Sequence, residues 1–277
     1  MTTAMAAQGR FRAGLLAAAA ASSVALALLA GCAAPQQQQQ QTGLDVVTPS
    51  DEPEHRRRAR IRMELASGYF SEGKPEIALD ELKQVVAIDP TLPDAYNLRG
   101  LIFMRLGDNR QAEENFRRAL ALNPRDANVH HNYGWLHCQS NRHAEAQRSF
   151  DTALSNPLYA GRSKTLMAQG LCQARAGQRD EAERSLARSY ELDAGNPITG
   201  YNLAQLLYQR GEFERAQFYI RRLNNTELAN SESLWLGIKV EQRMRDTAAM
   251  NQLSEQLRKR FPQSRERASL DRRAFDE

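Results

Sequence analysis

The side chains best able to bind a metal ion gather in the middle of the chain, where four of the five histidines lie between residues 130 and 143. His130 and His137 are seven residues apart, so on a helix they would share one face, with Cys138 beside them. A metal site needs three or four converging ligands and further groups that orient them. Positions 130 and 137 also suit aromatic packing residues of the helical repeat described below. We therefore predict packing roles, with a metal-dependent protein built around His130–Cys138 as an alternative.

No other spacing points to catalysis. The sequence contains no H-E-x-x-H, no G-x-S-x-G and no glycine-rich phosphate loop. Its carboxylates stand mostly among Arg and Gln on expected helix faces, which indicates a solvated surface. We predict no catalytic residue, no metal, no cofactor and no small-molecule substrate.

The cysteine that carries the clearest chemistry is Cys32. Arg10 and Arg12 precede an apolar run from Ala13 to Ala30, which is the layout of a secretory signal in residues 1–31. The run ends in Leu29-Ala30-Gly31-Cys32, which resembles the lipobox of bacterial lipoproteins. By that resemblance Cys32 becomes the lipidated first residue, carrying diacylglyceryl and an N-acyl group such as palmitate. A single membrane-spanning anchor is the alternative, since the run is 18 residues long.

The residues after Cys32 predict a tether to the outer membrane. Residue 33 is Ala, where an inner-membrane retention signal would usually have Asp, so we expect the lipid to sit in the outer membrane, on its periplasmic face. Residues 33–54 contain six consecutive glutamines and few apolar side chains, which predicts disorder. Fully extended, this segment would reach roughly 70 Å.

Charge gives little support for nucleic-acid binding. The chain has 37 basic and 33 acidic residues, and loss of Arg10 and Arg12 with the leader leaves a net charge of +2. The one concentrated run is Arg56-Arg57-Arg58-Ala59-Arg60. It fits either anionic lipid headgroups beside the tether or a solvated first helical turn, and we favour the second.

The elements that position these residues are helical hairpins. From Pro93 to Asp126 the chain follows the tetratricopeptide pattern of two antiparallel helices, W-x2-[LG]-G-x2-Y, then A-x3-F, then P. The small residue of the second helix recurs as Ala78, Ala112, Ala146, Ala182, Ala216 and Ala249, at separations of 34, 34, 36, 34 and 33. Twelve residues upstream of each stands the small residue of the first helix: Ala66, Gly100, Gly134, Gly170, Ala204 and Gly237. This register predicts an all-α solenoid of six helix–turn–helix repeats, wound as a right-handed superhelix.

The repeats set the domain boundaries. We predict the repeat domain over residues 55–262 and a charged tail over residues 263–277, either a capping helix or disordered. The segment from Asn156 to Arg162 adds two residues to the period between the third and fourth repeats. Gly73, Gly107, Gly177 and Gly211 are expected at the turns between paired helices.

The remaining cysteines, Cys138 and Cys172, fall about two-thirds along the first helices of the third and fourth repeats. Those helices should stack side by side, and an exported protein meets oxidising conditions. We therefore predict a disulfide between them, with two buried thiols as the alternative. The chain-entropy estimate for the loop of about 33 residues is about 3–4 kcal/mol.

The first helices of tetratricopeptide repeats line the concave face, and here that face is apolar. We predict a groove for a hydrophobic peptide, rimmed by Arg60, Arg105, Lys164 and Arg175. Packing against neighbouring helices is the alternative for any one residue. The predicted groove residues are Met63, Phe70, Leu101, Met104, Trp135, Met167, Leu171, Tyr201 and Tyr208, with Ile198, Leu234 and Ile238 as further candidates.

The order of lipobox, polar tether and six repeats resembles the type IV pilus biogenesis/stability lipoproteins, the pilotins of the PilF/PilW family. Asn132-Tyr133-Gly134-Trp135, Asn156-Pro157-Leu158-Tyr159 and Leu234-Trp235-Leu236-Gly237-Ile238 look like that family's own variants. The resemblance covers essentially the whole mature chain. It implies a non-enzymatic helper that binds the type IV pilus secretin and promotes its outer-membrane localisation and multimer assembly.

Another class of envelope protein remains an alternative. A tetratricopeptide lipoprotein can instead dock cell-wall hydrolases or outer-membrane assembly factors. Copurification of the secretin would favour the pilotin, and copurification of a hydrolase would favour the adaptor.

Overall fold

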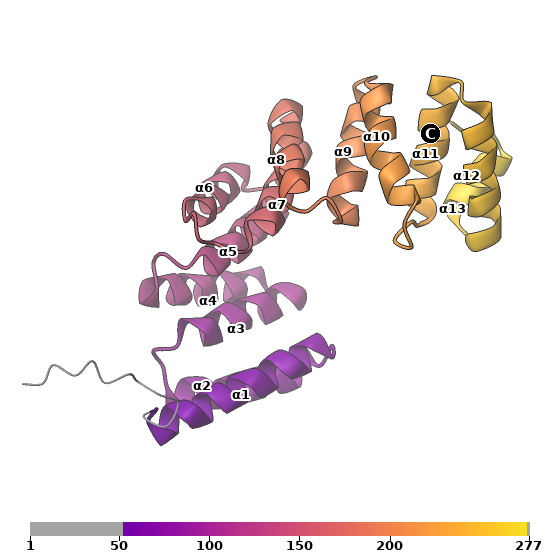
Figure 1. The fold of residues 1–277 in the computed structure, drawn as a ribbon. Coiled ribbons are helices and arrows are strands. Elements are labelled where there is room, and N and C mark those ends of the chain that lie inside the picture. Colours follow the sequence, from indigo (N-terminus) through magenta and orange to yellow (C-terminus); the bar gives the residue numbers. More distant parts are fainter. Residues whose placement is uncertain (1–51, 276–277) are drawn as a thin grey trace, which may run out of the picture. The chain divides into compact units, whose positions relative to one another are not determined.

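The computed structural model describes residues 52–275, and within that span the chain forms thirteen α-helices and no strand. Twelve helices pair in sequence order into six hairpins, which follow one another in Figure 1. The prediction of an all-α tetratricopeptide solenoid of six repeats is confirmed. The predicted leader, Cys32 and most of the tether lie outside the described residues.

The repeats share one plan, a first helix (A) and a second helix (B). The first three are α1 (Glu54–Ser71) with α2 (Pro75–Ile88), α3 (Pro93–Arg105) with α4 (Asn109–Leu122), and α5 (Ala127–Gln139) with α6 (His143–Leu154). The last three are α7 (Arg162–Arg175) with α8 (Arg179–Leu192), α9 (Pro197–Gln209) with α10 (Phe213–Asn224), and α11 (Ser231–Met244) with α12 (Thr247–Arg260). A short α13 (Arg265–Asp271) follows.

Every hairpin turns through one residue with a positive φ. In four repeats it is one of the predicted glycines, with φ between 77° and 80°. In the third and sixth repeats it is Asn141 (φ 59°) and Arg245 (φ 61°), which the sequence analysis did not single out. Asparagine enters the left-handed region comparatively easily, whereas an arginine there pays about 1–2 kcal/mol for its Cβ.

Where the A and B helices of a repeat cross, the small A-helix residue faces a large side chain on the B helix. A Cβ added at Gly100 would lie 2.6 Å from the Phe116 ring, and one at Gly134 would lie 2.8 Å from Phe150. At Gly170 the opposing atom is Leu186 Cγ, 2.7 Å away. At these three crossings an added atom would therefore force the opposing side chain to shift.

Ala249 is the exception among the predicted small B-helix residues. The five corresponding alanines in the earlier repeats are fully buried, but Ala249 is only half-buried. In the sixth repeat a Cβ added at Gly237 would instead lie 3.0 Å from Leu253 Cδ1 and 2.6 Å from Asn224 Nδ2. The close approach there thus involves the preceding repeat as well.

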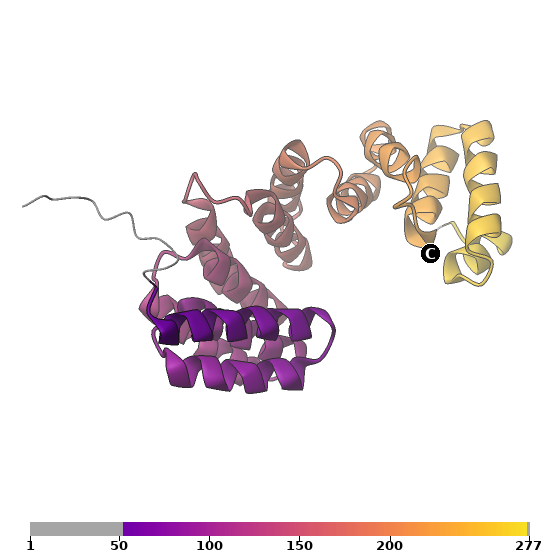
Figure 2. The ribbon, with the colours of Figure 1, turned by 60° about the horizontal axis from the view of Figure 1, so that its bottom comes forward.

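The charged tail contains a helix that closes the last repeat. α13 contacts α11 and α12, and Leu270 on α13 joins a core with Leu234, Ile238 and Leu257. Phe275 stacks on Trp235 at a ring separation of 5.4 Å. Figure 2 shows α13 beside the last hairpin. Of the two alternatives predicted for the tail, residues 265–271 form the capping helix.

The basic run lies in the first turns of α1. Ala59 is buried, and the arginines around it are exposed. Arg56 Nε lies 3.7 Å from Asp89, and Arg60 pairs with Glu52 at 3.2 Å and Glu64 at 3.1 Å. This arrangement is the solvated helical turn that the sequence analysis favoured.

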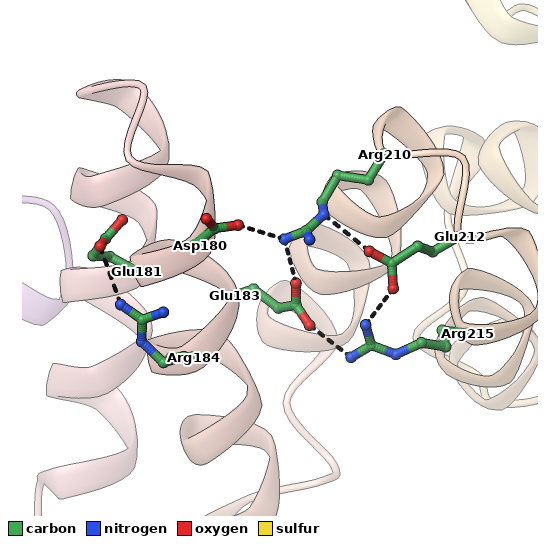
Figure 3. A network of polar contacts seen from close by, with 7 residues as sticks. All are labelled: Asp180, Glu181, Glu183, Arg184, Arg210, Glu212 and Arg215. Carbon is green, nitrogen blue, oxygen red and sulfur yellow. Dashed lines mark hydrogen bonds and ion pairs between the residues drawn. The ribbon is translucent and has the colours of Figure 1, made fainter.

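Ion pairs link the fourth and fifth repeats at the turn end of their helices (Figure 3). Arg210, just after α9, reaches Asp180 at 2.8 Å and Glu183 at 2.7 Å, both on α8. Arg215 on α10 reaches Glu183 at 2.6 Å and also pairs with Glu212. Glu183 is mostly buried, so this network is screened less than isolated surface pairs.

Candidate partner-binding groove

The nine predicted groove residues all lie half-buried on A helices. Met63 and Phe70 pack at the edge of the first core, and Leu101 and Met104 at the edge of the next. The others follow along the solenoid: Trp135, Met167, Leu171, Tyr201 and Tyr208. Each side chain therefore shares its surface between a core and solvent.

Aromatic rings on one A helix meet cations on the next. Arg105 lies 5.4 Å from the centre of the Phe70 ring, and Arg175 lies 5.1 Å from that of Trp135. Lys239 on α11 lies 5.6 Å from the Tyr208 ring on α9. Such pairs contribute about 0.5–2 kcal/mol each. They also place a positive charge next to these three aromatic rings of the A-helix face.

A cleft opens along α7, α9 and α11. One part, of about 340 Å³, lies between α7 and α9, and a second part, of about 400 Å³, lies between α9 and α11. Gln205 and Gln209 line both parts, so they adjoin. We call this surface the α7–α11 cleft; its other lining residues include Leu171, Arg175, Asn202, Tyr201, Tyr208, Glu232, Trp235, Lys239 and Glu266.

Three of the nine predicted groove residues, Leu171, Tyr201 and Tyr208, meet in this cleft. The polar members Gln205, Gln209 and Lys239 were not among the groove residues predicted from the sequence. A signal for the two glutamines existed, because they are four residues apart on α9 and so share a face. Burial lowers the pKa of Lys239.

Two of the three further groove residues predicted from the sequence were wrong. Leu234 and Ile238 are fully buried in the core that α13 completes, and they do not face a groove. Their neighbour Trp235 lines the cleft instead. Ile198, at the start of α9, is 51% exposed.

His130, His131 and His137 do not converge with Cys138 on a common point. His130 Nε2 lies 2.9 Å from the Pro124 carbonyl oxygen, and His131 Nδ1 lies 2.9 Å from Thr165 Oγ1. His137 packs on the Tyr133 ring at 4.0 Å. Burial lowers the pKa of both His131 and His137 to about 4, so both rings are neutral at pH 7. The arrangement is one of packing, and the His130–Cys138 metal site does not form.

Cys138 and Cys172 are joined by a disulfide in the structure, with their Cα atoms 5.8 Å apart. Both are buried, and they share a core with Ala146, Phe150 and Ala168. The bond links α5 to α7, and thus the third repeat to the fourth, across the two-residue insertion.

Within residues 52–275 no helix is both long and apolar enough to cross a bilayer.

Comparison with known proteins gives consistent matches. Tetratricopeptide-repeat families match residues 67–107, 93–126, 115–148 and 173–234. The type IV pilus assembly protein PilF of Pseudomonas aeruginosa is 31% identical over 206 residues, covering 74% of this chain and 81% of that protein.

Two solved structures share the fold over most of their length. A structure from the functional characterisation of Pseudomonas aeruginosa PilF superposes with a TM-score of 0.72 at 26% identity, covering 80% of this chain and all of that one. The crystal structure of PilW, described as a widely conserved type IV pilus biogenesis factor, superposes with a TM-score of 0.69 at 29% identity. The match covers 76% of this chain and 97% of that one.

Proposed function

The chain belongs to the PilF/PilW family of type IV pilus biogenesis proteins with tetratricopeptide repeats, and on that premise we propose that it is an outer-membrane pilotin. It binds the type IV pilus secretin through its A-helix groove and promotes secretin localisation and multimer assembly. This role requires no catalysis.

The observation that supports secretin binding most directly is the α7–α11 cleft. Its apolar members, such as Leu171 and Trp235, can bury side chains of a bound segment. Gln205 and Gln209 carry amides, which both donate to and accept from a peptide backbone. The surface therefore fits an apolar segment whose backbone remains available for hydrogen bonds.

Deletion of the gene tests the proposal as a whole. We expect heat-resistant secretin multimers to disappear from the outer membrane while secretin monomer is still made. Multimers at the normal level in the normal membrane would contradict the pilotin role. Copurification of a cell-wall hydrolase in place of secretin would favour the adaptor alternative.

We expect Leu171→Asp to weaken secretin binding by about 10- to 100-fold, the range for loss of a central contact in an interface. The change puts a carboxylate in the cleft, where a bound apolar segment would have to desolvate it. Leu158→Asp is the matched control, because Leu158 is 91% exposed on the linker between α6 and α7. Binding titrations with purified secretin compare the two variants. Equal affinities would show that the cleft is not the binding surface.

We expect Cys32→Ala to leave a folded protein that no longer fractionates with the outer membrane, because several acyl chains provide the anchor. The repeats begin more than twenty residues later, so their core does not depend on the lipid. Ala33→Asp is the companion variant and should keep the lipid but hold the protein at the inner membrane. Membrane fractionation followed by immunoblotting distinguishes these outcomes. Outer-membrane recovery of Cys32→Ala would disprove lipid anchoring.

A further inference from the structure

A third potential ligand lies beside the disulfide, contributed by a residue that the sequence analysis did not connect with it. His143 is the first residue of α6, whereas Cys138 lies on α5 and Cys172 on α7. The nearest ligand atoms of these three side chains all lie within 4.8 Å of one another. His143 Nδ1 is 3.6 Å from Cys172 Sγ.

This spacing fits the geometry of a tetrahedral zinc site. With Zn–S near 2.3 Å and Zn–N near 2.0–2.1 Å, a tetrahedral angle puts a sulfur and a nitrogen ligand about 3.6 Å apart. Two sulfur ligands come about 3.8 Å apart, so the cysteine sulfurs would separate by side-chain rotation once their bond is cut. The His143–Cys172 distance would not need to change.

The surroundings favour a fixed site with one open side. Cys138 and Cys172 are 1% and 3% exposed, and they are held on packed A helices. His143 is only half-buried, so the third ligand lies at the solvent boundary. A fourth position can be filled from that side by water, as in zinc sites with three protein ligands.

We propose that reduction of the Cys138–Cys172 disulfide turns this junction into a zinc site formed by Cys138, Cys172 and His143. A protein dithiol of the disulfide-exchange class supplies two electrons and two protons. Its thiolate attacks one sulfur of the bridge and forms a mixed disulfide, while the other cysteine leaves as a thiol. The second thiol of the reductant then attacks the mixed disulfide, which frees the remaining cysteine as a thiol and leaves the reductant as a disulfide. Zinc then binds both sulfurs as thiolates, and their two protons pass to solvent.

The consequence is a junction that stays cross-linked in both redox states. In the oxidised protein the disulfide joins the third and fourth repeats, and in the reduced protein the metal does. The oxidised form has no thiolate and should not take up the metal here.

The test begins with a phosphine that reduces the bridge; one water is consumed, and the products are phosphine oxide and two thiols. If the folded protein resists, it is reduced in denaturant and refolded without oxygen. Cobalt(II) is then added as a spectroscopic substitute for zinc. We expect one cobalt per chain, with a thiolate charge-transfer band and the visible bands of a tetrahedral site. Zinc should displace it and raise the melting temperature of the reduced protein.

Variants separate this site from adventitious binding. His143→Ala should weaken zinc binding by about 100-fold or more, beyond the ~10–100-fold typical of losing an outer-shell partner. His130→Ala removes a histidine on α5 whose Nε2 lies 2.9 Å from the Pro124 carbonyl oxygen, and it should leave the zinc affinity unchanged. Reduced protein that binds no metal, or that binds it equally well in His143→Ala, would overturn the proposal.

Discussion

Replacement of Gly134 by leucine is expected to destabilise the protein by more than about 3 kcal/mol. The added Cβ alone would lie 2.8 Å from Phe150 Cε1, and Phe150 is fully buried. Overpacking a well-packed core costs about 1–3 kcal/mol, and leucine adds three more carbons to that contact. Helices α5 and α6 would have to separate. Urea unfolding followed by circular dichroism measures the loss.

Gly68→Ala is the matched control and should have the opposite sign. Gly68 lies inside α1, with no atom within 4 Å of an added Cβ. Alanine there should stabilise the helix by about 0.5–1 kcal/mol, since glycine loses more backbone freedom on folding. If Gly134→Leu and Gly68→Ala shift stability alike, the crossing does not depend on a small residue.

Arg221→Met is expected to cost about 3 kcal/mol or more, because it leaves a buried carboxylate without its cation. Glu241 on α11 is fully buried and accepts from Arg221 Nε at 2.7 Å and Nη2 at 2.8 Å. Gln217 Nε2 also donates to that carboxylate, at 2.8 Å, but its amide carries no charge that could replace the guanidinium. The bonds to Glu241 also raise the pKa of the Arg221 guanidinium. Removal of one member of a buried pair typically costs about 3–5 kcal/mol.

Two variants set the scale for this prediction. Arg184→Met breaks an exposed pair with Glu181 on α8 (Figure 3) and should cost less than about 0.5 kcal/mol. The double variant Arg221→Met/Glu241→Met should come within about 1 kcal/mol of the original protein, since it buries no charge. Chemical denaturation of all three gives the comparison. An Arg221→Met loss no larger than that of Arg184→Met would contradict the role assigned to the buried carboxylate.

The sequence by itself determined the repeat. Small residues recurring every 33 to 36 positions, each pair twelve residues apart, specify which faces of two helices meet, because helical periodicity is local. Glycine at four of the six turns indicated where the chain reverses direction, since glycine alone adopts a positive φ without steric cost. Those features were sufficient to predict six hairpins and their order.

Only the tertiary structure decided which A-helix side chains face the groove. Leu234 and Ile238 occupy groove positions of the repeat pattern, yet α13 packs on α11 and buries them. The spacing of the repeats does not predict this additional helix, because α13 follows the last repeat and lies outside the repeat pattern. In the same way His143 reaches Cys172 across 29 residues of chain, from the start of another helix. Such contacts depend on how separate hairpins stack, and no local spacing encodes that geometry.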